Sequence, residues 1–271
     1  MSGFVDLHVH SAPSLMPRHG DDRATAVSAR QAGIDVFVLK AHEGSTAERA
    51  QLVGGGAVGG IVLNSPVGGA NADAVRVAAL LGARVVWLPT ISSPAHQRAD
   101  RSAELAVHRK VALTAVPICD GDTLHRAWMT VFEEVAAADM VLASGHATID
   151  EAIMAFAAAR QVGVRRLLVN HPLMPFLGWR DEHAPTLRRL GANLELGVLP
   201  DLLAADESAG TARLARTYPP ELLVFGSDLG HADFPTLEAG VAAWVERCEP
   251  IVGSTLLERI MSSNGLELVA A

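Results

Sequence analysis

The sequence predicts an α/β protein, specifically a (β/α)8 TIM barrel built as a single domain from residues 1–271. Eight apolar runs of strand length alternate with amphipathic, alanine-rich stretches, which is typical of parallel strands covered by helices. Eight such units in 271 residues favour a closed barrel over an open sheet. Several runs also end in a histidine or an aspartate, as expected where barrel strands meet at a common mouth.

The strand positions follow from the apolar runs and from the signals between them. The spacing Thr148-x-x-Glu151 predicts a capped helix after the fifth strand. Residues 108–122 do not fit the alternation, and we expect residues 111–118 to form an extra strand. Glycines that end helices precede four of the strands: Gly33, Gly82, Gly163 and Gly191. The eight barrel strands are expected at residues 4–10, 36–42, 60–63, 84–89, 140–146, 166–171, 192–196 and 222–228.

Composition excludes several classes of function. The chain has a net charge of -8 and no cluster of Lys and Arg, so a nucleic-acid partner is not expected. No apolar stretch has the length of a membrane helix, and no signal peptide is visible. The two cysteines, Cys119 and Cys248, have no Cys-x-x-Cys spacing, which suits a reducing compartment. We therefore expect a cytoplasmic protein that acts on a small molecule. The sequence leaves undecided whether it forms a homo-oligomer.

The first strand carries two histidines on one face. The chain reads Asp6-Leu-His8-Val-His10 at the end of an apolar run, and side chains two positions apart on a strand point the same way. Two imidazoles at the mouth of a barrel can hold one metal ion, and imidazole suits zinc, iron, copper or nickel rather than magnesium or calcium. Such a pair is often no more than two polar residues at a rim, so the prediction depends on further ligands.

The same kind of residue recurs at the ends of later strands. Taken singly, each histidine is as well explained as a hydrogen-bonded rim residue. For the whole set, we put the chance of a purely structural explanation at roughly one in ten. Three other histidines, His108, His125 and His183, are expected at the surface. The expected metal ligands are His8, His10, His42, His146, His171 and Asp228, with Glu43, His96, Glu195 and His231 as additional candidates.

As a set, the motifs resemble the metal-ligand signature of the amidohydrolase superfamily. That superfamily has His-x-His after strand 1, His after strands 5 and 6, and Asp after strand 8. The corresponding segments here are Asp6-Leu-His-Val-His10, Ser-Gly-His146, Val-Asn-His171 and Gly-Ser-Asp228. The resemblance covers the whole chain and implies divalent metal ions at the barrel mouth. The chain is also partly similar to PHP-type phosphoesterases, although Asp228-Leu-Gly-His231 is one residue longer than their Asp-x-His.

One departure from the amidohydrolase pattern concerns a lysine. Many binuclear members bridge their metals with a carboxylated lysine after strand 4, where this chain has Pro89-Thr90. Lys40 follows strand 2 instead, two residues before His42 and so on the same face. Three functional roles stay open for Lys40: a carboxylated ligand, a partner of an acidic ligand, or a site for a substrate anion. A structural ion pair in the barrel mouth is about as well supported.

A histidine beyond the hydrolase set changes the expected chemistry. A hydrolytic metal keeps an open position for water, whereas additional nitrogen ligands suit iron. With Leu39-Lys-Ala-His42 after strand 2 and Asn64-Ser-Pro-Val-Gly-Gly69 after strand 3, the chain resembles a smaller family of TIM-barrel proteins. That family includes the nonheme diiron monooxygenase of platensimycin and platencin biosynthesis. The resemblance implies two iron ions, dioxygen activation and, often, coenzyme A-linked substrates.

Three hypotheses of function follow. The preferred one is a diiron, O2-dependent monooxygenase of secondary metabolism, which hydroxylates a bulky apolar substrate, terpenoid or CoA-linked, with an electron donor as partner. The alternative is a metal-dependent hydrolase with zinc or manganese that cleaves an amide, lactone or phosphoester bond. In that case Asp228 is ligand and general base, and His171 polarises the electrophile. The third is a metal-binding barrel without catalysis, which the ligand set favours least.

Two loops are expected to contact the substrate. Residues 174–179 follow the sixth strand, and there Phe176 and Trp179 can line an apolar pocket or simply pack on the barrel rim. Arg18 lies in the loop after the first strand, and it either binds a carboxylate or phosphate or is a solvated loop charge. The expected catalytic residues are Asp228, His171 and Lys40.

The position of His42 outside the usual hydrolase set gives a test. If His42 is a metal ligand, His42→Ala lowers the metal-to-protein ratio of the purified protein, because one donor is lost. Elemental analysis by mass spectrometry measures that ratio. Full metal content and activity in His42→Ala would show that this histidine is structural.

Overall fold

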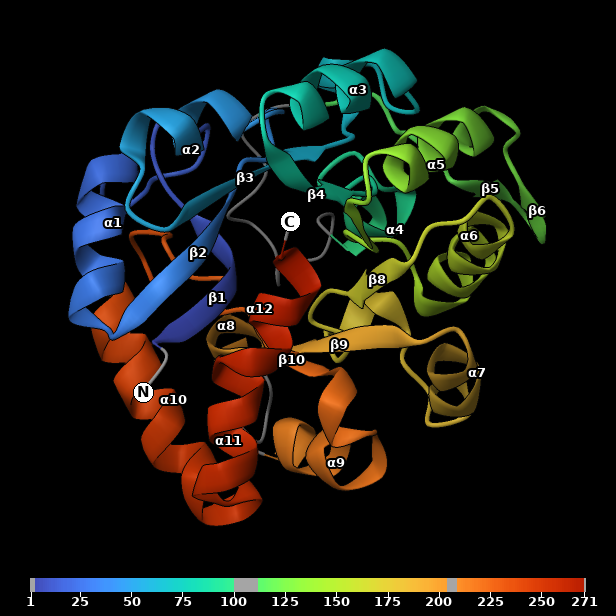
Figure 1. Ribbon diagram of the computed structural model, residues 1–271. Helices are drawn as coiled ribbons and strands as arrows, with labels where there is room; N and C mark the ends of the chain where they lie inside the picture. The colour runs from blue at the N-terminus through green and yellow to red at the C-terminus, as the bar shows by residue number, and fades with distance from the viewer. Residues whose placement is uncertain (1–2, 100–111, 204–208, 271) are drawn as a thin grey trace.

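The computed structural model describes residues 3–99, 112–203 and 209–270, and its centre is a barrel of eight parallel strands (Figure 1). The strands are β1 (Phe4–His10), β2 (Ile34–Lys40), β3 (Ala57–Val62), β4 (Ala83–Trp87), β7 (Val141–Ala143), β8 (Arg166–Val169), β9 (Ala192–Leu196) and β10 (Leu223–Phe225). Val9 bridges Leu229, and the Asp228 amide donates to the His8 carbonyl at 2.8 Å, so β1 meets the segment after β10. The expected (β/α)8 fold is confirmed.

Helices cover the outside of the barrel, because its strands are apolar on both faces (Figure 1). None of the described helices combines the length and the apolar character needed to cross a membrane. The outer helices are α1 (Asp22–Gln31), α2 (Ala47–Val53), α3 (Ala72–Leu80), α5 (Ala127–Ala137), α6 (Ile149–Gln161), α7 (His183–Arg189), α9 (Ala209–Thr217) and α10 (Leu237–Val252). The chain also forms α4 (Pro94–Ala99), α8 (Val198–Leu203), α11 (Ser254–Met261), α12 (Ser263–Val269) and the 3-10 turns η1 (Ser65–Val67), η3 (Pro175–Leu177) and η4 (Pro220–Leu222).

The helix signals in the sequence have their expected effect. The Thr148 hydroxyl accepts from the Glu151 amide at 3.2 Å, and the Glu151 carboxylate accepts from the Thr148 amide at 2.8 Å. This capping box begins α6 where it was predicted. A positive φ, between 63° and 98°, occurs at each of the four glycines that precede strands: Gly33, Gly82, Gly163 and Gly191.

The amino-terminal end of the barrel is filled by the last helix, α12, which lies near the centre of the strand ring in Figure 1. Leu268 and Val269 pack into the cluster of inward-facing side chains that includes Val5 and Val85. Arg166 Nη1 donates to the Leu268 carbonyl at 3.0 Å and so fixes the end of the helix. Because this end is closed by packing, the carboxyl ends of the strands are left to form a site.

The segment before α5 differs from the expectation. Residues 112–118 form no strand, and residue 111 lies outside the described residues, so the extra strand predicted for 111–118 is wrong over 112–118. A small antiparallel hairpin follows instead, made of β5 (Cys119–Asp120) and β6 (Thr123–Leu124). The reason is that β4 pairs directly with β7, with Val85 opposite Val141, which leaves no barrel edge for another strand.

Two of the three histidines expected at the surface lie in the described residues. His125 is exposed, as predicted, whereas His183 is buried, so that prediction is wrong. Its Nδ1 accepts from the Arg180 amide at 3.0 Å, and its Nε2 lies 3.1 Å from the Asp150 carboxylate, so the ring joins α7 to α6. The third, His108, lies outside the described residues.

The packing of α12 gives a stability test. Leu268 is 6% exposed and Leu266, on the same helix, is 44% exposed. Leu268→Ala should lower the free energy of unfolding by about 2–4 kcal/mol, because it leaves a cavity against the strands. Leu266→Ala should change the free energy by no more than about 0.5 kcal/mol. Urea denaturation followed by tryptophan fluorescence measures both, and equal effects would argue against the role given to α12.

Candidate metal centre

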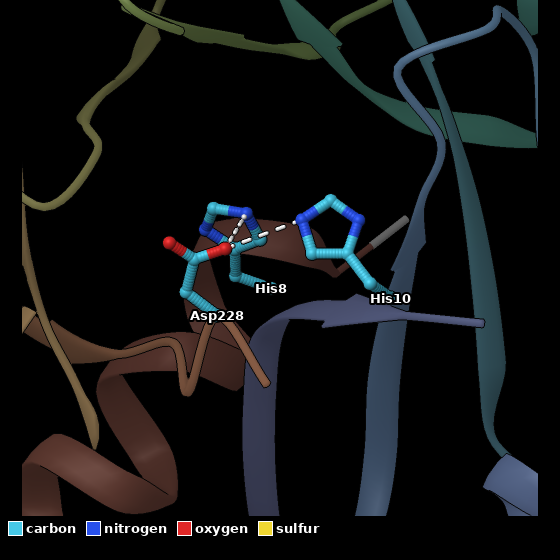
Figure 2. A group of neighbouring side chains, drawn as sticks. All are labelled: His8, His10 and Asp228. Atoms are coloured by element: carbon cyan, nitrogen blue, oxygen red, sulfur yellow. Dashed lines mark ion pairs between the residues drawn. The ribbon is translucent and has the colours of Figure 1, made fainter. Parts of the chain in front are cut away.

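Two histidines and an aspartate meet at the carboxyl end of the barrel. His8 and His10 are the inward-facing residues at the end of β1, and Asp228 follows β10. In Figure 2, the Asp228 carboxylate reaches both rings: its Oδ1 lies 3.0 Å from His8 Nε2 and 3.2 Å from His10 Nε2. One nitrogen or oxygen from each residue lies within 4.8 Å of the others. This spacing fits ligands of one metal ion.

The hydrogen bond of His10 decides which of its nitrogens faces Asp228. His10 Nδ1 lies 2.9 Å from the Lys40 carbonyl oxygen, which can only accept, so Nδ1 carries the ring proton. Burial, and then the nearby Arg18, lower the pKa of His10 well below its usual range, so the ring is neutral. His10 Nε2 and the Asp228 carboxylate therefore meet as two acceptors. A cation bound between them would satisfy both acceptors.

His8 is held from its other side by Glu195 of β9. Glu195 Oε1 lies 2.9 Å from His8 Nδ1, and Glu195 Oε2 accepts from Asn170 Nδ2 at 2.7 Å. Burial lowers the pKa of His8, but the Asp228 and Glu195 carboxylates outweigh this effect and raise the pKa to about 9. A carboxylate behind the ring commonly orients a metal-binding histidine and fixes its tautomer. Glu195 therefore lies behind His8, rather than within the group that includes Asp228.

The position of Asp228 depends on Asp6, the first residue of the β1 motif. Asp6 Oδ1 accepts from the His8 amide at 3.0 Å and from the Ser227 amide at 2.9 Å, so it joins β1 to the segment after β10. Asp228 itself has a φ of +55°, a left-handed conformation that is uncommon outside glycine. Strain of this kind persists where the surrounding hydrogen bonds hold the backbone, and it often occurs at functional sites.

Three further histidines continue the wall that His8 and His10 begin. Neighbouring ring centroids lie 4.9 Å apart for His10 and His42, 5.9 Å for His42 and His146, and 5.1 Å for His146 and His171. The ring centroids of His171 and His8 lie 5.7 Å apart, so the five histidines form a closed circle. Five of the predicted ligands therefore surround the barrel mouth, next to the sixth, Asp228.

His171 lies in this wall with both ring nitrogens unpaired. Nδ1 and Nε2 are buried and have no hydrogen-bond partner among the described residues. Burial lowers the pKa of His171 to about 4, so the ring is neutral near pH 7. Buried polar atoms are normally satisfied, and leaving them unpaired costs about 1–3 kcal/mol each. A ligand at the barrel mouth, whether a metal or a substrate, would supply the partner.

Lys40 lies at the floor of the same group. It is buried, with Nζ 2.9 Å from His8 Nε2 and 5.6 Å from the centre of the Trp87 ring. Burial lowers the pKa of Lys40 to about 8, against the attraction of the Asp228 and Glu195 carboxylates. One of Lys40 and His8 must accept from the other, so one of the two is neutral in this contact. Carboxylation of Lys40 stays a prediction.

Two histidines of this wall are held by polar neighbours. His42 Nδ1 lies 2.8 Å from the Thr90 hydroxyl. His96, on α4, lies 2.8 Å from His146, Nδ1 to Nδ1, and the two rings stack with centroids 4.7 Å apart. His96 therefore helps to fix the position of the His146 ring.

A pocket next to these groups is lined by both polar and apolar side chains. Its polar lining includes Arg18, Asp228 and His231. Glu43 lies in the loop beside it, where its Oε1 accepts from the Leu15 amide at 2.6 Å. Trp179 does not line this pocket, because its indole donates to Asp181 and its ring packs against His183. The apolar lining residues are Met174, Phe176, Leu199, Leu203 and Phe234.

The sequence alone does not reveal several residues of this site. Asp6 belongs to the β1 motif, but its contact with Ser227 depends on barrel closure. Asn170, which positions Glu195, is adjacent to the predicted ligand His171 and could have been found there. The apolar residues Leu199 and Phe234 come from segments with no pattern that marks them as pocket residues.

Comparisons with known proteins identify a family whose sequence profile matches this chain. The sequence profile of the family described as "Family of unknown function (DUF6282)" matches residues 3–195. A search of curated protein sequences finds no match.

Solved structures that resemble this one are amidohydrolase-like TIM barrels. One is a probable 2-pyrone-4,6-dicarboxylic acid hydrolase of Acinetobacter baumannii with citric acid bound, with a TM-score of 0.65, 13% identity and coverage of 99% of this chain and 100% of that chain. A 2,6-dihydroxybenzoate decarboxylase from Rhizobium has a TM-score of 0.61, 12% identity and coverage of 99% of both chains. An amidohydrolase from Burkholderia multivorans with bound zinc has a TM-score of 0.55, 14% identity and 99% coverage of both. These structures share the fold of this chain.

The contact between Glu195 and His8 gives a prediction for metal binding. Glu195→Gln should weaken the affinity for Zn(II) by about 10–100-fold, because the neutral amide supports His8 less well than a carboxylate does. Competition with a chelating dye measures the affinity. Glu134→Gln is the matched control, since Glu134 forms a surface ion pair with Arg76 away from the barrel mouth. Equal affinities in the two variants would contradict the role given to Glu195.

Proposed function

The chain belongs to the family DUF6282, and we propose that it is a metal-dependent hydrolase that cleaves an amide, lactone or phosphoester bond of a small-molecule substrate. The observation that supports this proposal best is the group of His8, His10 and Asp228, whose ligand atoms lie within 4.8 Å of one another at the barrel mouth. Active sites of TIM-barrel enzymes lie at this end of the strands.

The donor set fits a divalent transition metal. His8, His10 and Asp228 are proposed to hold the ion, with His42, His146 and His171 as further ligands for it or for a second ion. Neutral imidazoles with one carboxylate suit zinc, iron or manganese. The lone pair of His10 Nε2 that faces the Asp228 carboxylate supports this assignment, because a cation satisfies both acceptors. A metal bound there supplies a water of lowered pKa and a Lewis acid for the scissile bond.

The side chains around the metal group would carry the proton transfers. Asp228 is ionised, because the charge of the neighbouring His8 holds its pKa well below the usual range in spite of burial. A carboxylate in this position can accept a proton from the attacking water. His171, neutral and unpaired, can donate one ring N–H to the oxygen of the scissile group. The apolar residues of the pocket would keep bulk water away from Asp228 and His171.

Hydrolysis is preferred over hydroxylation for this site. Of the three solved structures described above, one is named as a hydrolase, one as an amidohydrolase and one as a decarboxylase. The same fold therefore accommodates reactions of this kind, which need no external electron donor. The diiron monooxygenase, its CoA-linked or terpenoid substrate, its electron donor and a homo-oligomeric state remain predictions of the sequence.

Anaerobic reconstitution separates the two chemistries. The chelated protein is loaded with Zn(II), Mn(II) or Fe(II) without oxygen and tested on panels of amides, lactones and phosphoesters. We expect turnover with Zn(II) or Mn(II) and a loss of at least about 100-fold in kcat for Asp228→Asn, which removes both a ligand and a base. Asp73→Asn, an exposed change of the same kind, serves as the control. Turnover that requires both Fe(II) and dioxygen would contradict the hydrolase assignment.

A further inference from the structure

We propose that Arg18 binds a carboxylate of the substrate, and that the substrates of this site are organic monoacids with an apolar body. The inference rests on the proposed function for the position of the scissile bond. The binding of the acid itself can be tested separately from hydrolysis.

The backbone holds Arg18 at the rim of the pocket. The His19 amide donates to the Gly230 carbonyl at 3.0 Å, and the Ala232 amide donates to the Pro17 carbonyl at 3.1 Å. The loop after β1 is thus paired with the loop after β10, on both sides of Arg18. A side chain on a segment paired in this way has a defined position. It lines the same pocket as His10 and Asp228.

The guanidinium of Arg18 has donors that none of the described residues uses. Its Nε and Nη2 are buried and have no hydrogen-bond partner among the described residues. Arg49, in the same region, shows the contrast, since its Nη2 donates to Asp22 at 2.6 Å and to the Ser11 hydroxyl at 3.0 Å. Burial lowers the pKa of Arg18 only to about 10, so it keeps its charge near pH 7. A cation whose donor atoms are buried and open is a site for an anion.

The chemistry of the anion follows from the rest of the pocket. Arg18 is the one Lys or Arg among the described lining residues, and Asp228 adds a negative charge nearby. Among the lining side chains, a phosphate monoester with two charges would find a single arginine to pair with and a carboxylate to repel it. A carboxylate has one charge, and its two oxygens match the planar fork of arginine. The five apolar lining residues provide contacts for a hydrophobic body.

The test measures the binding of acids and of their neutral amides to the metal-loaded protein. The probes are benzoate, 3-phenylpropanoate and hexanoate, each beside its primary amide, and isothermal titration calorimetry gives the dissociation constants. At least one acid should bind at least about tenfold more tightly than its amide. Arg18→Gln should remove this preference, and Arg18→Lys should restore part of it because the charge returns without the fork.

Matched variants and measurements keep the interpretation clear. Arg23→Gln removes an equal charge from an exposed position on α1 and should leave the binding of acids unchanged. The metal content of Arg18→Gln should equal that of the wild type. Acids that bind no better than amides, acids that fail to bind at all, or an Arg18→Gln variant with unchanged acid affinity would each overturn the proposal.

Two outcomes separate this inference from the proposed function. If Arg18 only balances the charge of Glu43, Arg18→Gln lowers the melting temperature and leaves acid binding unchanged, which overturns the inference alone. If acids bind through Arg18 but no panel compound is hydrolysed with any metal, the inference holds and the hydrolase assignment fails.

Discussion

The contact between the two β1 histidines and Asp228 is the interaction on which the rest of the barrel mouth depends. His10 presents a lone pair to a carboxylate that is 3.2 Å away, and His8 lies 3.0 Å from the same oxygen. Without a cation, the positive charge in this group comes from the pair of His8 and Lys40, one of which carries an additional proton. A divalent ion would replace that proton and satisfy both acceptors. The surrounding polar residues hold these side chains in the positions that binding of the divalent ion requires.

The barrel architecture explains how distant residues come together there. Asp6 and Asp228 are joined through Ser227 because β1 closes the ring next to β10. Glu195 contacts His8, from which it is 187 positions away in the sequence, because both side chains point into the barrel near its carboxyl end. Because α12 fills the amino-terminal end of the barrel, the buried charged side chains lie together at the carboxyl end. There, the closure of the barrel holds the left-handed backbone conformation of Asp228.

The sequence predicts a part of this arrangement for physical reasons. Period-two alternation places His8 and His10 on one face, and parallel strands bring His146, His171 and Asp228 to the same end. The strand at residues 192–196 has the predicted bounds. What could not be predicted depends on contacts between distant segments. The role of Glu195 behind His8, the open donors of Arg18, and the direct pairing of β4 with β7 in place of an extra strand all require the closed barrel.

Anomalous diffraction tests the central claim most directly. Crystals grown with Zn(II) are measured on both sides of the zinc absorption edge, so that a difference peak locates the ion without assumptions about the ligands. The account predicts a peak about 2.0–2.2 Å from His8 Nε2, His10 Nε2 and an Asp228 oxygen. It also predicts that Lys40 Nζ no longer contacts His8 Nε2. A zinc-loaded crystal with no peak at the barrel mouth, or with the contact between Lys40 and His8 intact, would contradict the account.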